Sequence, residues 1–223
     1  MPNTEPTELK LKAQRYLFLA GEGNQTATQH MENAPPQQCR PLQMTVVKFT
    51  KPYPFFAHCL DNGMNPRITI TSHQSEDGKF IWYLGGQLAE DGAKRSITDQ
   101  IAAAKKELAT LFPWLDLSSA EWGSFYINRA EPKQPDGKRP DSPFLQIHQN
   151  RMVGWPTKLA LSPLLVDAII NAAKEQNLVP SPASFSQDLT LLNLLPKPSI
   201  AKPVWEEIFN SSYKISKSIP EIV

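Results

Sequence analysis

The chain has 223 residues, of which 40% are hydrophobic and 20% are charged, the balance of an ordinary globular protein. A formal net charge of +1 gives no basic excess, so a nucleic-acid partner is not expected. No apolar run approaches the ~20 residues that a membrane-spanning helix needs. With a polar N-terminus and only two cysteines, Cys39 and Cys59, we expect a cytoplasmic protein without a membrane span.

Strand patterns dominate the first part of the sequence. Residues 15–25 predict a short buried strand that ends in a glycine turn, and residues 29–41 read as a connection. Residues 42–50 are rich in β-branched side chains and predict a second strand. Residues 67–73 and 79–86 flank a turn and predict an antiparallel hairpin.

The clearest helical pattern covers residues 98–112, where apolar side chains recur at helical spacing and Thr98 is a candidate N-cap. Alternation over residues 121–132 predicts a further strand. Residues 144–147 and 151–155 then predict a short hairpin.

A second helix is expected from Ser162 to Glu175, and one helical turn at 203–210. The order strands, helix, strands, helix predicts an α+β fold, with an antiparallel or mixed sheet, flanking helices and no complete Rossmann βαβ unit. Proline is unusually frequent, with 21 residues, and its crowding at 132–143 and 180–203 predicts loops there.

The sequence AGEGNQT, which follows the first predicted strand, contains a possible nucleotide-binding turn. Gly21 and Gly23 match two glycines of the dinucleotide fingerprint, but the third position is Thr26 and Pro35 arrives too soon for a long helix. The acidic residue that the fingerprint requires about 20 positions later is absent as well. A tight glycine turn is the simpler interpretation, and such a turn can still line a ligand because glycine lets backbone approach closely.

The sequence gives no evidence for a metal site or for a hydrolase active site. His30, His58, His73, His148 and Cys59 show none of the spacings by which side chains share a metal ion. Neither a Gly-x-Ser-x-Gly elbow nor a P-loop sequence occurs. We therefore predict no metal site and assign no catalytic residue.

Two strand residues are candidates for binding a substrate. Trp82 and Tyr83 must lie on opposite faces of their strand, so that one of them, Tyr83, can face a ligand while the other packs in a core. Arg129, near the end of the fourth predicted strand, suits a carboxylate clamp because guanidinium groups bind carboxylates in a bidentate manner. A surface salt bridge is the alternative for Arg129.

The segment VGWPTKLALSP joins the last hairpin to the last helix. We take Ser162 as the N-cap, with Pro163 at the first helical position. Gly154, Pro156, Thr157 and Lys158 form a loop just before that helix start. The loop and the positive end of the helix dipole predict a site for an anion, although an ordinary strand–loop–helix junction remains the alternative.

The ordered series of motifs over residues 12–207 resembles the later part of FAD-dependent oxidoreductases of the D-amino-acid oxidase and glycerol-3-phosphate dehydrogenase type. YLFLAGEGN resembles the strand and glycine turn that end the nucleotide-binding part in this family. The other motifs are FIWYLGGQLAEDG, LFPWLD, NRAEP…RPDSPF, VGWPTKLALSPLLVD and PVWEE.

The resemblance implies a domain order. Residues 1–28 would end an otherwise missing FAD-binding part, and residues 29–150 would form the substrate-binding domain. Residues 151–178 would be a flavin-contacting segment, followed by a Pro-rich tail at 179–223. The resemblance further implies hydride transfer from a C–N or C–O bond of a small amine, amino acid or hydroxy compound to flavin N5, with the protein supplying orientation and electrostatics.

The cofactor implied is FAD, and the pyrophosphate-binding fingerprint of the family is not found in the chain. The residues implied to contact the cofactor are Gly21, Gly23, Gly154, Trp155, Pro156, Thr157, Lys158 and Ser162. Arg129 and Tyr83 would face the substrate, although the loop after Arg129 is longer than in the family. Three further readings stay open, namely a non-catalytic binding or interaction module, one subunit of a split oxidoreductase whose partner is a separate FAD-binding chain, and an unrelated α+β protein.

Overall fold

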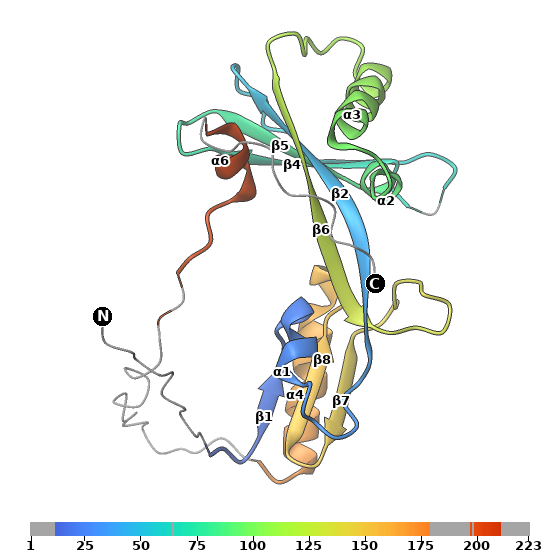
Figure 1. Ribbon diagram of the computed structural model, residues 1–223, viewed down its shortest axis with the longest axis vertical. Helices are drawn as coiled ribbons and strands as arrows, with labels where there is room; N and C mark the ends of the chain where they lie inside the picture. Colours follow the sequence, from blue (N-terminus) through green and yellow to red (C-terminus); the bar gives the residue numbers. More distant parts are fainter. Residues whose placement is uncertain (1–11, 64, 179–196, 198, 211–223) are drawn as a thin grey trace, which may run out of the picture. The chain divides into compact units, whose positions relative to one another are not determined.

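The computed structural model describes residues 12–63, 65–178, 197 and 199–210 of the chain (Figure 1). The chain forms two compact units, each built from two stretches of sequence. Unit 1 comprises Met1–Cys39 and Ala130–Ser186, and unit 2 comprises Arg40–Arg129 and Gln187–Val223. Each unit is described below by itself.

The elements of unit 1 are short except for one helix. They are β1 (Tyr16–Phe18), η1 (Gly21–Gly23), α1 (Asn24–Ala27), β7 (Phe144–His148), β8 (Arg151–Trp155), η2 (Leu159–Leu161) and α4 (Ser162–Glu175). The elements of unit 2 are β3 (Ala57–Cys59), β4 (Ile68–Gln74), β5 (Phe80–Gly85), α2 (Gln87–Gly92), α3 (Ile97–Leu111) and α6 (Val204–Phe209). The boundary between the units falls within β2 (Gln37–Phe49) and β6 (Glu121–Pro132).

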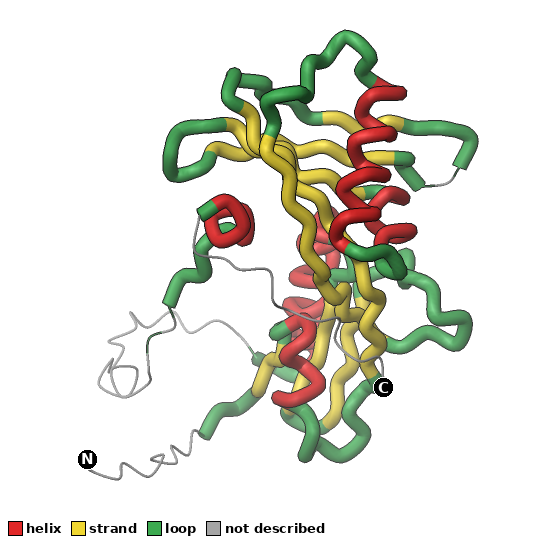
Figure 2. The backbone as a smooth tube through the Cα atoms, turned by 45° about the horizontal axis from the view of Figure 1, so that its top comes forward, coloured by secondary structure: helices red, strands yellow, loops and turns green. Residues whose placement is uncertain are grey.

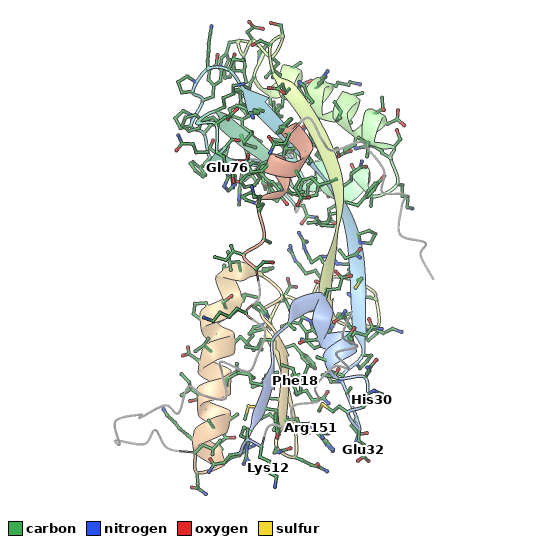
Figure 3. The ribbon with its side chains drawn as sticks, turned by 60° about the vertical axis from the view of Figure 1, so that its left-hand side comes forward. Lys12, Phe18, His30, Glu32, Glu76 and Arg151 are labelled. Atoms are coloured by element: carbon green, nitrogen blue, oxygen red, sulfur yellow. The ribbon has the colours of Figure 1, made fainter. Side chains whose placement is uncertain are left out.

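Unit 1 contains a three-stranded sheet in the order β1-β8-β7. β1 pairs with β8 in parallel, with Leu17 opposite Met152, whereas β7 and β8 form the antiparallel hairpin that the sequence predicts. α4 lies beside these strands (Figure 3) and buries Leu165 and Ala172. Parallel pairing is typical of sheets whose two faces are both covered by other elements.

Unit 2 contains a five-stranded sheet in the order β3-β4-β5-β2-β6. β4 and β5 form the predicted hairpin, with Thr71 opposite Tyr83. α3 covers one face of the sheet and α6 lies on the other (Figure 2). The core on the α3 side consists of Val47, Phe49, Ile68, Ile70, Trp82, Leu84, Leu88, Ala104 and Leu108.

The α6 side of this sheet is lined by a second apolar cluster. Leu42 and Met44 of β2 and Ala89 of α2 form its buried part, and Tyr83, Phe125 and Ile127 pack against it. Because neighbouring strand residues point to opposite faces, Trp82 lies in the α3-side core while Tyr83 lies on this side. The predicted opposition of Trp82 and Tyr83 is therefore confirmed, as is the α+β class with antiparallel and mixed sheets.

Several strand boundaries differ from the sequence prediction. β1 is not buried, because it is an edge strand and Leu17 is 47% exposed. β2 begins at Gln37, inside the expected connection 29–41. Residues 37–41 lack apolar alternation, and none of them is buried, so period-two patterning could not find the start of the strand.

Two short elements and one helix cap were also not predicted from the sequence. α2 and β3 have six and three residues, too few to show a period. α3 is capped by Ser96, whose Oγ accepts a hydrogen bond from the Asp99 N–H at 3.1 Å, so Thr98 is not the N-cap. The predicted tail 179–223 lies outside the described residues except for 197 and 199–210, where α6 confirms the predicted helical turn.

In the part of the chain that the structure describes, no helix is both long enough and apolar enough to span a bilayer.

Candidate functional site

The glycine turn of unit 1 is fixed to the end of β8. Gly21 adopts a φ of 58°, in the left-handed region that favours glycine. Its carbonyl oxygen accepts a hydrogen bond from Trp155 Nε1 at 3.1 Å. Trp155 is only 2% exposed, so the indole is a buried support for the turn.

Asn24 makes a second connection between the same two segments. Its Oδ1 accepts from the Ala20 N–H at 2.7 Å, and its Nδ2 donates to the Gly154 carbonyl at 3.2 Å. Asn24 is fully buried, so both bonds are made away from water. The sequence offered one sign of this residue, an asparagine directly after a glycine turn, where its side chain can bond to nearby backbone.

Gly154 and Gly23 differ in how much space the surrounding chain leaves for a side chain. A Cβ on Gly154 would lie 3.0 Å from Leu19 Cδ2 and 3.2 Å from Leu165 Cδ1, so packing within the chain requires glycine there. A Cβ on Gly23 would meet only Ala20 Cβ at 3.4 Å, an ordinary contact, and the φ of Gly23 is −67°. Gly23 is exposed, and nothing in the described chain requires glycine at this position.

The loop after β8 carries local backbone strain. Thr157 has a φ of 59°, which is costly for a β-branched residue. Its Oγ1 donates to the Ser142 carbonyl at 3.1 Å, which helps to hold the conformation. Lys158 Nζ lies 3.4 Å from Asp141 Oδ1, and both groups are exposed enough for the pair to contribute less than about 1 kcal/mol.

The start of α4 differs from the sequence prediction. Leu161 is the N-cap residue and Ser162 is the first helical residue, without a capping hydrogen bond from a side chain. The reason is η2, because this 3-10 turn runs directly into α4 and the Ser162 N–H donates to the Leu159 carbonyl. The helix ends at Glu175 as predicted, and Pro163 lies within its first turn.

Unit 1 exposes apolar side chains at two places, in and just after β1 and along α4. Leu17 and Leu19 are each 47% exposed, and β1 is the edge strand of its sheet. Leu164, Val166 and Ile170 of α4 are exposed as well. Apolar surface of this kind in a folded unit indicates a surface that another molecule or another part of a protein covers.

In unit 2, Tyr83 is the centre of an aromatic group on the α6-side face. Its ring lies 5.9 Å from the ring of Phe125, 6.2 Å from that of His73 and 6.3 Å from that of Trp205. Burial raises the pKa of the Tyr83 hydroxyl, and the positive charge of Arg129 opposes this shift. The two predicted substrate residues are therefore close enough to interact electrostatically.

Arg129 takes part in an ion-pair group. Its Nη1 lies 3.4 Å from Glu90 Oε1, and Arg40 Nη1 lies 3.2 Å from Glu90 Oε2. The salt bridge that the sequence left as the alternative for Arg129 is thus present. A carboxylate clamp by Arg129 stays a prediction, because the guanidinium would have to share its contacts with Glu90.

α6 is anchored on the same face by a buried carboxylate. Glu206 accepts hydrogen bonds from Ser75 Oγ, at 2.9 and 3.1 Å, and from the Glu76 N–H at 2.9 Å. The adjacent Trp205 stacks on the His73 ring with centroids 4.7 Å apart. This helical turn is predicted from the sequence, but without a role, because a single turn in a Pro-rich stretch carries no signal for packing.

The structure thus brings together most of the predicted site residues within each unit. Gly21, Gly154 and Trp155 are linked in unit 1, with Gly23 in the same turn, while Pro156, Thr157 and Lys158 follow directly along the chain. In unit 2, Tyr83 packs on the same sheet face as Phe125 and Ile127, and alternation along β6 places Arg129 on that face as well. Asn24, Glu90 and Trp205 were not predicted from the sequence. No cluster of three or more metal-binding side chains occurs among the described residues.

No protein-family model matches the chain. The chain is 43% identical over 202 residues to a Pseudomonas aeruginosa protein named "Probable FAD-dependent oxidoreductase PA4991", which covers 90% of this chain and 50% of that protein. The crystal structure of the FAD dependent oxidoreductase PA4991 from Pseudomonas aeruginosa matches with a TM-score of 0.77 and 44% identity. That match covers 89% of this chain and 53% of the other.

The chain therefore spans about half the length of the relative that it matches. At this identity and TM-score the two proteins share a fold over the matched part.

Proposed function

We propose that this chain is part of a FAD-dependent oxidoreductase of the D-amino-acid oxidase type, in which unit 1 contacts the flavin nucleotide and unit 2 binds the substrate. The observation that carries the proposal is the pairing of the Gly21 turn with Trp155 and Gly154. Two segments 130 residues apart, each assigned to the cofactor by resemblance, form one supported turn. The similarity to PA4991 points to the same cofactor.

The residues of unit 1 fit such a group. The turn leaves its backbone open, since no atom of the described chain lies within 4 Å of a Cβ position on Gly21 and only Ala20 Cβ, at 3.4 Å, meets one on Gly23. The edge position of β1, with Leu17 exposed on it and Leu19 exposed just after it, suits a sheet that further parallel strands would extend. These features support the division in which residues 1–28 end a FAD-binding part and residues 151–178 contact the flavin.

When bound, the flavin would supply the capacity to accept a hydride from a C–N or C–O bond of a small substrate. The chain's own residues would bind and orient it. Lys158 would hold its positive charge near an electron-rich edge of the ring, and its weak exposed pair with Asp141 can be given up at little cost. The strained Thr157 would fix the path of the loop.

The substrate would lie on the α6-side face of unit 2, against Tyr83. A tyrosine hydroxyl is protonated at neutral pH, and burial raises the pKa of Tyr83 further, so it can donate a hydrogen bond. Arg129 would add positive potential for a carboxylate. The chain supplies no residue to which we assign a proton-transfer role.

The proposal is tested by flavin binding. The purified chain is mixed with FAD, alone and together with the part of PA4991 that this chain does not match, and the bound flavin is measured by visible absorbance after gel filtration. Flavin bound in either mixture supports the proposal, and binding only in the second supports a partner that supplies the nucleotide site. A folded chain that retains no flavin in either mixture contradicts it.

A non-catalytic interaction module is the second candidate. The exposed apolar residues of β1 and α4 favour it, because they suit a protein partner as well as a cofactor-binding part. In that case the chain and the unmatched part of PA4991 would elute from gel filtration as a complex without the visible absorbance of flavin.

A further inference from the structure

We propose that a cavity between α3 and β6 of unit 2 binds a small, mainly apolar carboxylate, whose charged group pairs with Lys105. The cavity has a volume of about 450 Å³. Its wall residues Phe112, Leu115 and Trp122 pack against the core on the α3 side of the sheet, whereas Tyr83 lies on the α6 side. The site is therefore separate from the substrate face of the proposed function and goes beyond it.

The cavity is lined mainly by apolar side chains. α3 contributes Lys105 and Ala109, which lie one helical turn apart on one face of the helix, and β6 contributes Trp122. The segment that joins the two elements supplies the other apolar walls, namely Phe112, Leu115, Leu117 and Ala120. A cavity of this size, with apolar walls and few polar groups, is typical of sites for small organic molecules.

The segment between α3 and β6 is held in place by contacts within the chain. The Leu115 N–H donates to the Phe112 carbonyl at 2.9 Å, and the Ser118 N–H donates to Asp116 Oδ1 at 2.9 Å. The Phe112 ring packs against the buried Trp82, with ring centroids 6.2 Å apart. The walls are therefore ordered without a ligand, so binding requires little loss of conformational freedom.

Lys105 is the one charged group among the described residues that line the cavity. Its ammonium lies over the Trp122 ring, 5.3 Å from the ring centre, and makes no ion pair in the part of the chain that the structure describes. The carboxylate of Asp116 is bound by Ser118 instead, whose hydroxyl and N–H lower the pKa of Asp116. A cation placed beside apolar walls, without a carboxylate from its own chain, favours an anionic ligand.

The same groups disfavour cationic and neutral ligands. An ammonium group would meet the positive charge of Lys105, and Ser118 is the one lining side chain that could accept its hydrogen bonds. A neutral apolar molecule would gain the wall contacts alone. A molecule with one carboxylate and a compact apolar body would use both the walls and the ammonium.

The test is a titration of the full 223-residue chain, labelled with ¹⁵N at its five tryptophan indoles and followed by NMR. The probes are cinnamate, cinnamyl alcohol and cinnamylamine, which share a ring and a side chain and differ in the polar group. We expect cinnamate to shift the Trp122 indole signal in a saturable way, and the other two probes to bind at least about three-fold more weakly. Trp122→Phe identifies the signal, and contacts to Lys105 in wild-type spectra identify it if this variant fails to fold.

Two substitutions separate the shape of the cavity from its charge. Ala109→Leu is at an exposed helical position, and its larger side chain should fill part of the cavity and weaken cinnamate binding about ten-fold. Lys105→Gln should weaken binding about three-fold, the size of effect expected for an exposed ammonium. The matched controls are Ala102→Leu and Lys106→Gln, which make the same exchanges at exposed α3 positions outside the cavity lining and should leave the affinity unchanged.

Four results would overturn the inference. The Trp122 signal could stay unchanged at the highest soluble cinnamate concentration, or cinnamylamine or the alcohol could bind as tightly as cinnamate. Cinnamate could shift only Trp155 or Trp205, which do not line the cavity. Finally, Ala102→Leu could weaken binding as much as Ala109→Leu.

The inference and the proposed function can fail separately. Flavin binding without a Trp122 response overturns the cavity assignment alone. A Trp122 response without flavin binding in either mixture supports the cavity and contradicts the oxidoreductase proposal.

Discussion

Trp155 donates a hydrogen bond from its indole Nε1 to the carbonyl oxygen of Gly21 at 3.1 Å, although 134 residues separate the two in sequence. The bond joins the end of β8 to the turn after β1, and the two strands pair in parallel beside it. It therefore fixes the position of the turn that we assign to the cofactor. Several consequences of this arrangement, and of the α6 contacts in unit 2, can be measured.

Trp155→Phe should destabilise the chain by about 2 kcal/mol, because it removes a buried hydrogen bond and leaves a small cavity. Urea denaturation followed by circular dichroism measures the change. Trp114→Phe, at a 78% exposed position, should change stability by less than about 0.5 kcal/mol. Equal effects of the two substitutions would show that Trp155 does not support the turn.

Gly21→Ala and Gly23→Ala should behave differently. Gly21 has a φ of 58°, so an alanine there should cost about 1 kcal/mol of stability. Gly23 has an ordinary φ and an open Cβ position, so its alanine variant should unfold like the wild type. The same Gly23→Ala variant should nevertheless bind FAD more weakly in the mixture that binds it. Unchanged flavin affinity would remove Gly23 from the cofactor site.

Gly123→Ala should loosen α6, because the new Cβ would lie 2.4 Å from Ile208 Cγ2. Overpacking of this kind costs about 1–3 kcal/mol. Relative to the wild type, the substitution should speed up amide hydrogen exchange more in α6 than in α3, which lies on the other face of the sheet. The double variant Gly123→Ala with Ile208→Ala removes the clash, so its effect should be clearly smaller than the sum of the two single effects.

Asp77 predicts a pH dependence at the β4–β5 turn. The Lys48 ammonium, 2.8 Å away, lowers the pKa of this carboxyl from its ordinary 3.8 to about 2. A lowered pKa in the folded state stabilises the protein above pH 3.8, and this contribution is lost as the pH falls toward 2.

Asp77→Asn should therefore lower the urea midpoint at pH 6 and have a much smaller effect at pH 2, where about half of the Asp77 carboxyl is protonated in the folded state. Asp136→Asn is the control, because its Lys138 partner is 82% exposed and its pair lies in an open loop. A difference between wild type and Asp77→Asn that is as large at pH 2 as at pH 6 would show that the charge is not the cause.

Local patterns in the sequence predict the regular parts of this fold well. The helix at 162–175, the strand at 121–132 and both hairpins follow from period and turn chemistry alone. What the sequence does not reveal are contacts over long separations. Asn24 and Gly154, or Trp205 and His73, meet only because separate segments pack together.

The candidate site residues fall into the same two groups, those with a local sequence signal and those that only long-range packing defines. Gly21, Gly154 and Tyr83 carry local signals, such as a glycine turn or an aromatic residue on an alternating strand. Ser162 was assigned as a cap from its residue type, but η2 continues into α4 and moves the cap to Leu161. Glu206 reads as one of two ordinary surface acids, and only the packing of α6 on the β4–β5 turn makes it a buried anchor.

The most direct test of the account is the visible absorbance of flavin that remains with the purified chain after gel filtration, with and without the unmatched part of PA4991. The account predicts a bound flavin in at least one of the two mixtures, and less of it when Gly23→Ala replaces the wild type. A folded chain that retains no flavin in either mixture would contradict the assignment of unit 1 to the cofactor.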